Sequence, residues 1–269
     1  MILVTGATGN VGRHTVAQLA ELGVPARALV RNPAAQLPVP TVVGDLTDPS
    51  TLPAALDGVS TVFLIWPGFA ASTAAEVISV IERHASRIVY LSANVTPETK
   101  IFHNDVERLI RASGLSWTFL RPGGFASNTL GWAEQIREGV VRWPYGKAAR
   151  SLIHEADIAS VATHVLTTEG HEGQSYVLSG PEVLSQADQV RIIGEAVGRT
   201  VTWDDLPPAV AREELVAAWG DEGFVDGALA AWAAMVDVPE PVVDTVERLT
   251  GKPARTFHQW AEDHAEDFR

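Results

Sequence analysis

The first twelve residues, MILVTGATGNVG, constrain the fold of this chain more than any other stretch. The apolar run at positions 2–4 predicts a buried strand, three glycines follow at intervals of three, and a helical pattern covers residues 11–22. A glycine turn between a strand and a helix can admit a pyrophosphate, because bare backbone approaches the ligand and the first helical amides lack internal partners. The spacing therefore predicts a dinucleotide site at Gly6, Ala7, Thr8, Gly9, Asn10, Val11 and Gly12.

Strand and helix patterns alternate through residue 125. Strands are expected at 2–4, 26–30, 41–44, 59–65, 87–91 and 117–120. Helices are expected at 11–22, from a cap at Asp48 or Ser50 through Leu56, at 70–85 and at 100–112. This alternation implies parallel strands joined by right-handed crossovers. We therefore expect an α/β doubly wound parallel-sheet (Rossmann) domain over residues 1–125, with ligands at the carboxyl ends of its strands.

The pattern becomes less regular beyond residue 125. Helices are expected at 128–137, 157–167 and 185–197, short strands near Val140 and Leu152 and at 175–178 and 201–203, and a helical tail from about 208. We interpret residues 126–269 as a smaller C-terminal α+β lobe, interleaved with the first domain as one structural unit. Such a lobe would complete a substrate cleft.

Composition excludes several classes of function. The net charge of −13 argues against a nucleic-acid partner, which would select clustered Lys and Arg. The chain has no cysteine, and its eight histidines are scattered, so we expect neither thiol chemistry nor a metal site. A core strand at residue 2 indicates no leader peptide, and Pro67 with Gly68 breaks the apolar run that would otherwise suggest a membrane span. We expect a cytoplasmic protein with a small-molecule substrate and no membrane partner, and a homodimer stays open.

Two positions bear on which dinucleotide binds. The second predicted strand ends in Val30-Arg31-Asn32, where an NAD site usually places a carboxylate for the ribose 2′-hydroxyl. A guanidinium there suits a 2′-phosphate, so Arg31 favours NADP(H), with NAD(H) left open. Asp45 follows the third strand, where it either accepts from the adenine amino group or serves as an ordinary turn residue.

Six segments together resemble the NmrA-like, atypical short-chain dehydrogenase/reductase family: GATGNVG, ALVRNP, GDLTDP, VYLSA, SGLSWTFLRPGGFASN and PARTFHQWAEDH. That family includes NAD(P)H-dependent quinone and triarylmethane-dye reductases and also NADP-binding redox sensors. The resemblance implies dinucleotide contacts from the glycine turn, from Arg31, and from Ile65, Trp66, Pro67, Gly123, Gly124, Phe125 and Asn128.

The loop from Gly123 to Asn128 also has a physical interpretation. Gly123 and Gly124 follow a parallel strand and would present bare backbone where a nicotinamide could lie. Asn128 would then hydrogen-bond the ring amide, the ribose or the substrate. The alternative for Asn128 is a helix N-cap, a position that favours asparagine.

The usual catalytic pair of the wider dehydrogenase superfamily, Tyr-x-x-x-Lys, is absent. His103 and Glu107 hold the corresponding helical positions, one turn apart. His103 is a candidate general acid, because an unperturbed imidazole titrates near neutral pH, with Glu107 orienting it; the alternative is a surface ion pair. Ser92 ends the fifth strand and is either a substrate-binding serine or a turn residue.

Three of the eight tryptophans, Trp66, Trp132 and Trp143, lie in segments expected near the cleft and would either stack on a flat substrate or pack in the core. We expect an NADP(H)-dependent oxidoreductase that transfers hydride to a quinone-like or other flat, electron-poor molecule. Two alternatives stay open: a non-catalytic NADP(H)-binding redox sensor, and a reductase that tailors a polyketide-like aromatic.

Overall fold

The computed structural model describes residues 1–68, 70–96, 99 and 101–269, and it divides into two compact units. The first unit contains Met1–Pro122, Glu155–Leu178 and Thr245–Pro253. The second contains Gly123–His154, Ser179–Asp244 and Ala254–Arg269. The chain therefore returns to the first unit twice after leaving it at Pro122.

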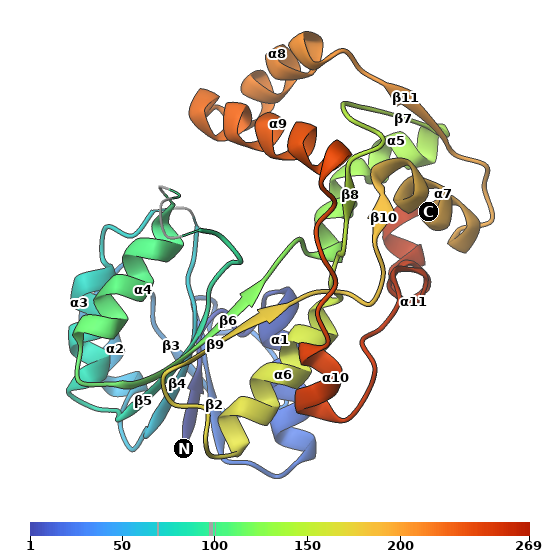
Figure 1. Ribbon diagram of the computed structural model, residues 1–269. Helices are drawn as coiled ribbons and strands as arrows, with labels where there is room; N and C mark the ends of the chain where they lie inside the picture. The colour runs from blue at the N-terminus through green and yellow to red at the C-terminus, as the bar shows by residue number, and fades with distance from the viewer. Residues whose placement is uncertain (69, 97–98, 100) are drawn as a thin grey trace. The chain divides into compact units, whose positions relative to one another are not determined.

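The first unit is built on a seven-stranded sheet in the order β3-β2-β1-β4-β5-β6-β9, with every neighbouring pair parallel (Figure 1). The strands are β1 (Ile2–Val4), β2 (Ala26–Val30), β3 (Thr41–Val43), β4 (Thr61–Ile65), β5 (Arg87–Leu91), β6 (Ser116–Pro122) and β9 (Gln174–Leu178). The strand order reverses between β1 and β4, which is the point where ligands bind in open α/β sheets. The predicted doubly wound fold is confirmed.

Helices cover both faces of this sheet. They are α1 (Asn10–Glu21), η1 (Pro49–Thr51), α2 (Leu52–Ala55), α3 (Ala74–Glu82), α4 (Phe102–Ala112), α6 (Glu155–Thr167) and α10 (Thr245–Thr250). Figure 1 shows α1, α6 and α10 on one face and α2, α3 and α4 on the other, in agreement with the contacts of α6 with α1 and α10. Val106 and Ile110 form the buried stripe of α4 at helical spacing. The predicted start of this helix, Lys100, lies outside the described residues.

The second unit is assembled from short strands and helices. Its elements are η2 (Ala126–Trp132), α5 (Ala133–Glu138), β7 (Val140–Trp143), β8 (Ala149–Arg150), β10 (Leu184–Ser185), α7 (Gln186–Ala196), β11 (Thr202–Asp205), α8 (Pro208–Trp219), α9 (Glu222–Asp237), α11 (Phe257–Asp263) and η3 (Ala265–Phe268). β8 pairs with β10 in antiparallel and β7 with β11 in parallel orientation. Its main core surrounds the fully buried Trp260.

The short strand expected near Leu152 is present as β8, and Ile153 forms an isolated bridge with Phe125. One expectation about the second half of the chain was wrong. The segments 157–167 and 175–178, expected in the smaller lobe, become α6 and β9 of the first unit. The reason is hydrogen bonding: β9 pairs with β6 over Thr118–Pro122 and so extends the main sheet.

None of the helices in the described part of the chain is long and apolar enough to span a bilayer. The described residues also contain no group of three or more metal-binding side chains.

Candidate functional site

The turn between β1 and α1 leaves no room for side chains at two of its glycines. Gly6 has a positive φ of 56°, and a Cβ there would stand 3.0 Å from the Ile65 side chain. A Cβ at Gly12 would stand only 2.1 Å from the Gly6 carbonyl oxygen and 2.7 Å from the Ala7 Cα. The first turn of α1 can approach the end of β1 this closely because residue 12 is a glycine and carries a hydrogen atom in place of a Cβ.

The N-terminus of α1 is open to an anion. Gly9 is the N-cap residue, and no side chain caps the helix with a hydrogen bond. The first turn contains no acidic residue. The leading amides and the positive end of the helix dipole therefore suit a diphosphate, and the glycine cradle admits it at close range. The residues at this turn fit the dinucleotide that the sequence predicts.

Arg31 stands directly after β2 and is exposed. Its guanidinium makes no hydrogen bond or ion pair to any residue that the structure describes. Arg31 interacts electrostatically with Asp45. A hydrogen bond from the Thr47 amide at 2.9 Å is the main cause that lowers the pKa of Asp45, and the charge of Arg31 lowers it further. The Thr47 bond gives Asp45 the turn role that the sequence left open, and its contact with adenine stays a prediction.

The loop after β4 is anchored by two residues. Thr5 Oγ1 donates to the Ile65 carbonyl at 2.9 Å and accepts from the Ile65 amide at 2.7 Å, which ties the end of β4 to the end of β1. Trp66 is buried, and its indole N–H donates to the Ala70 carbonyl at 2.8 Å. The Trp66 ring therefore packs in the core. Contacts of Ile65, Trp66 and Pro67 with the coenzyme stay predictions.

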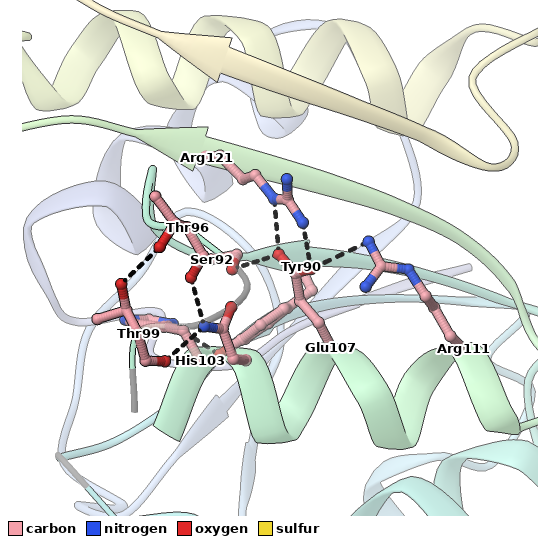
Figure 2. A network of polar contacts seen from close by, with 9 residues as sticks. Tyr90, Ser92, Thr96, Thr99, His103, Glu107, Arg111 and Arg121 are labelled. Atoms are coloured by element: carbon pink, nitrogen blue, oxygen red, sulfur yellow. Dashed lines mark hydrogen bonds and ion pairs between the residues drawn. The ribbon is translucent and has the colours of Figure 1, made fainter. Parts of the chain in front are cut away.

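A buried carboxylate links α4 to the sheet (Figure 2). Glu107 is 1% exposed and accepts hydrogen bonds from Ser92 Oγ at 2.7 Å and Arg121 Nε at 2.8 Å, while Arg121 Nη2 completes a two-pronged ion pair. Arg111 Nη2 lies 3.1 Å away on the same helix. Burial alone raises the pKa of Glu107, but the hydrogen bonds from Arg121 and Ser92 and the charges of both arginines outweigh it and hold the pKa below its usual value.

His103 has a different partner from the one that its spacing suggested. Its Nδ1 lies 2.8 Å from the Tyr90 hydroxyl, whereas Glu107 is bound to arginines and to Ser92 (Figure 2). The expectation that Glu107 orients His103 was therefore wrong, because β5 and β6 present better partners to both side chains. Burial lowers the pKa of His103 to about 4, although the charge of Glu107 opposes the shift.

This network changes what the two candidate catalytic residues can do. The imidazole of His103 is neutral at pH 7, and burial raises the pKa of Tyr90, whose hydroxyl stays protonated. The proton of Ser92 is directed at Glu107, and Ser92 is 3% exposed, so the hydroxyl holds the end of β5 against α4. The near-neutral pKa assumed for His103 was wrong, and a catalytic role for either residue stays a prediction.

The Gly123-Gly124 loop belongs to the second unit and is not bare. A Cβ at Gly123 would meet Glu240 Oε1 at 2.2 Å, and one at Gly124 would meet Arg150 Cζ at 2.6 Å. The side chains of Arg150 and Glu240 therefore cover the backbone that the sequence left open. Neither residue was singled out from the sequence, because no spacing brings positions 124, 150 and 240 together; the paired glycines were the only signal.

The remaining expectations for this segment are resolved in part. η2 begins after Phe125, so Asn128 is not an N-cap, and its side chain is exposed. Trp132 is buried between Trp143 and Trp203, with ring centroids at 6.3 and 5.7 Å, and packs in the core. Coenzyme contacts of Gly123, Gly124, Phe125 and Asn128 stay predictions.

Comparison with known proteins decides the family. The model of a family described as NAD(P)H-binding matches residues 6–169. The chain belongs to this NAD(P)H-binding family. It is 37% identical to a (4-alkanoyl-5-oxo-2,5-dihydrofuran-3-yl)methyl phosphate reductase of Streptomyces griseus, across 100% of this chain and 99% of that one. It is 36% identical to an NAD(P)H azoreductase of Xenophilus azovorans, with the same coverage of both chains.

A solved structure extends the likeness to three dimensions. The NADPH-dependent quinone oxidoreductase of Escherichia coli, in complex with NADPH, superposes with a TM-score of 0.80 at 26% identity, over 98% of this chain and 99% of that one. The resemblance to NmrA-like, atypical short-chain dehydrogenase/reductases is confirmed. This family member is an NAD(P)H-dependent oxidoreductase.

Proposed function

We propose that this oxidoreductase uses NADPH to reduce flat, electron-poor organic acceptors of the quinone or azo type. The observation that carries the coenzyme choice is Arg31, which is exposed at the end of β2, where an NAD site would hold a carboxylate, and which makes no hydrogen bond or ion pair to the described residues. The azo and quinone reductases among its relatives support the acceptor class.

The chain's own residues would hold the coenzyme by backbone and by charge. The amides of Asn10 and Val11 would point toward the diphosphate at the positive end of α1, while the Gly9 amide donates to the Gly6 carbonyl within the turn. The guanidinium of Arg31 would bind the 2′-phosphate of the coenzyme. The hydride itself is supplied by bound NADPH, and the protein contributes placement and exclusion of water.

The chemistry around α4 favours acceptors that need no strong acid. Tyr90 is protonated and bonded to His103, His103 is neutral, and Glu107 is held ionised by Arg121. A quinone or azo group accepts hydride and gives a stabilised anion, which water can protonate. A ketone lacks this stabilisation and would need a positioned acid such as the missing Tyr-Lys pair.

Turnover assays test this function directly. Purified protein is mixed with NADPH and a naphthoquinone, an azo dye or a triphenylmethane dye, and coenzyme and acceptor absorbance are followed together. We expect NADPH oxidation matched by acceptor loss with at least one of them, and weaker activity with NADH. Tight NADPH binding without turnover of any acceptor would contradict the proposal and favour the redox-sensor alternative.

A further inference from the structure

A hydrogen bond between β5 and α4, both in the first unit, determines how His103 presents its ring. Tyr90 in β5 is fully buried, and its hydroxyl oxygen lies 2.8 Å from Nδ1 of His103, in the first turn of α4 (Figure 2). This is the only hydrogen bond that the Tyr90 hydroxyl makes within the described part of the chain. A buried hydroxyl has to direct its proton at an acceptor, because an unpaired buried donor is costly.

The bond fixes which ring nitrogen of His103 carries the proton. A neutral imidazole has one N–H donor and one bare nitrogen that accepts. If Nδ1 carried the hydrogen, the proton of Tyr90 would face no acceptor among the residues that the structure describes. Nδ1 is therefore the acceptor, and Nε2 carries the hydrogen. Burial lowers the pKa of His103 to about 4 although the charge of Glu107 opposes the shift, so the ring is neutral at pH 7.

The Nε2–H group of His103 makes no hydrogen bond or ion pair to any residue in the described ranges. The side chain is half-buried, and Phe102 lies beside the ring with its centroid 3.9 Å away. Glu107, one turn further along α4, is occupied by Arg121 and Ser92 and does not compete for this hydrogen. The first turn of α4 therefore offers an oriented, neutral donor.

This donor lies in the same unit as the glycine turn and at the same edge of the sheet. α4 follows β5 along the chain, so its first turn lies toward the carboxyl ends of the strands. Neighbouring strands are about 4.8 Å apart, and β5 is the second strand from β1, which places it about 10 Å from the strand that enters the glycine turn. With Arg31 of β2 on the adenosine half, the nicotinamide half extends over β4 and β5.

We propose that His103 donates a hydrogen bond from Nε2 to the acceptor atom that gains negative charge, with Tyr90 as its positioning residue. This inference rests on the proposed function. As a quinone or azo compound takes up hydride from NADPH, a pair of its π electrons moves onto an oxygen or nitrogen atom, and NADP⁺ is left. The N–H group stabilises that charge and keeps its own proton. Water supplies the proton that completes the product.

The first test is a binding measurement that needs no turnover. The probe is para-nitrophenolate, a flat oxyanion that resembles the reduced acceptor, titrated into protein saturated with NADP⁺. Nitrogen NMR of the imidazole is expected to show the proton on Nε2 in the free protein and a shift of the Nε2 signal on binding. In His103→Leu the phenolate is expected to bind about tenfold more weakly. His103→Gln, whose amide also donates, is expected to recover part of this loss.

Tyr90→Phe tests the positioning role. The variant keeps the ring that packs in the core and removes only the hydroxyl. The imidazole is then expected to exchange between its two neutral tautomers, so that its nitrogen signals average. With a quinone that wild type reduces, kcat is expected to fall about tenfold with KM nearly unchanged, because the donor acts on charge that develops in the transition state.

A second Tyr–His pair in the first unit gives the matched control. The hydroxyl of Tyr176 in β9 lies 2.8 Å from Nδ1 of His171, which precedes the amino end of that strand. Tyr176→Phe therefore removes the same kind of bond away from the carboxyl ends of the strands. It is expected to leave the His103 spectrum, the phenolate affinity and kcat unchanged.

The pH profile separates a neutral donor from a general acid. Three groups form or face the donor, and from about pH 6 to pH 8 His103 stays neutral, Tyr90 stays protonated and Glu107 stays ionised. We therefore expect kcat to be level over this range. A general acid that titrates near neutral pH would instead make kcat fall as the pH rises.

Three results would overturn the proposal. The first is a wild-type spectrum with the proton on Nδ1, and the second is equal phenolate affinity in wild type and folded His103→Leu. The third is a fall of kcat across the neutral range that disappears in His103→Gln. Absence of NADPH oxidation with every acceptor would instead contradict the proposed function, while the tautomer and the phenolate affinity would still decide the role of His103.

Discussion

The carbonyl oxygen of Gly6 lies 2.1 Å from the place where a Cβ on residue 12 would stand. Backbone occupies that place, and backbone cannot rotate away as a flexible side chain would. The contact between β1 and α1 therefore depends on the absence of a single methyl group. The open amides of α1 keep their position for a diphosphate because of it.

Gly12→Ala tests this relationship. We expect the helix to shift, the free energy of unfolding to fall by about 1–3 kcal/mol as in other overpacked sites, and NADPH affinity to fall at least about tenfold. Calorimetric titration and urea unfolding measure the two effects. Gly227→Ala, in an open position of α9, is the control and is expected to be neutral or slightly stabilising. Unchanged NADPH affinity in Gly12→Ala would show that the coenzyme does not use this turn.

Arg31→Gln tests the choice of coenzyme. Loss of a guanidinium that pairs with the 2′-phosphate is expected to weaken NADPH binding about tenfold or more and to leave NADH binding nearly unchanged. Dissociation constants for both coenzymes, measured at two salt concentrations, give the ratio and its ionic component. Arg83→Gln removes an exposed arginine that hydrogen-bonds Ser79 and serves as the control. Equal losses for NADPH and NADH would contradict a 2′-phosphate role.

The buried pair between Glu107 and Arg121 is expected to stabilise the first unit. Glu107→Gln removes the charge that two arginines face and is expected to lower the free energy of unfolding by about 3 kcal/mol. The exposed pair Asp105–Arg108 on the same helix offers the control, since Asp105→Asn is expected to change stability by less than about 1 kcal/mol. Similar effects in both variants would mean that burial adds nothing to the Glu107 pair.

Glu107 also makes stability depend on pH in acid. Its pKa is lower in the folded than in the unfolded chain, so its contribution is fully present above its ordinary pKa of about 4.5. That contribution is lost as the pH falls through the folded pKa, because the unfolded chain then binds the proton more readily. Urea unfolding of wild type below pH 4.5 is expected to show this decline. In Glu107→Gln, the part of the decline that is due to Glu107 is expected to be absent.

His103 acts in a separate window. Its folded pKa of about 4 lies below the ordinary value of 6.5, so the unfolded chain binds the extra proton between these values. Stability is therefore expected to fall as the pH drops below 6.5, by at most about 1.4 kcal/mol per pH unit, until the folded pKa is reached. In His103→Gln, the free energy of unfolding is expected to depend less on pH in this range. Proton NMR of the imidazole checks the pKa itself: a titration midpoint near 6.5 for His103 would contradict the buried contact with Tyr90.

The local sequence pattern was sufficient to predict strands β1 to β6 and the glycine turn between β1 and α1. The strands from β1 to β6 are short runs rich in apolar residues, and all of them except β2 are followed by a helical segment, so the order of these elements can be predicted along the chain. The glycines of residues 6–12 also predicted the turn between β1 and α1. The residues that approach each other closely in this turn are neighbours in sequence, so a local pattern can show them.

The partners of the functional side chains were decided by the tertiary structure. Helical spacing placed His103 beside Glu107, but parallel pairing of β5 with β6 presented Tyr90 and Arg121 to them instead, and these contacts offered better hydrogen bonds than the helix did. Arg150 and Glu240 meet across ninety positions at a loop whose glycines gave only a hint.

The sequence by itself therefore determined a parallel α/β sheet and the turn at which it binds a dinucleotide, because both follow from interactions between residues close along the chain. Only the tertiary structure decided which charges are buried, which pair with one another, and that β9 joins the edge of the sheet. Those outcomes depend on which distant segments come to lie side by side, and no short-range pattern encodes that competition.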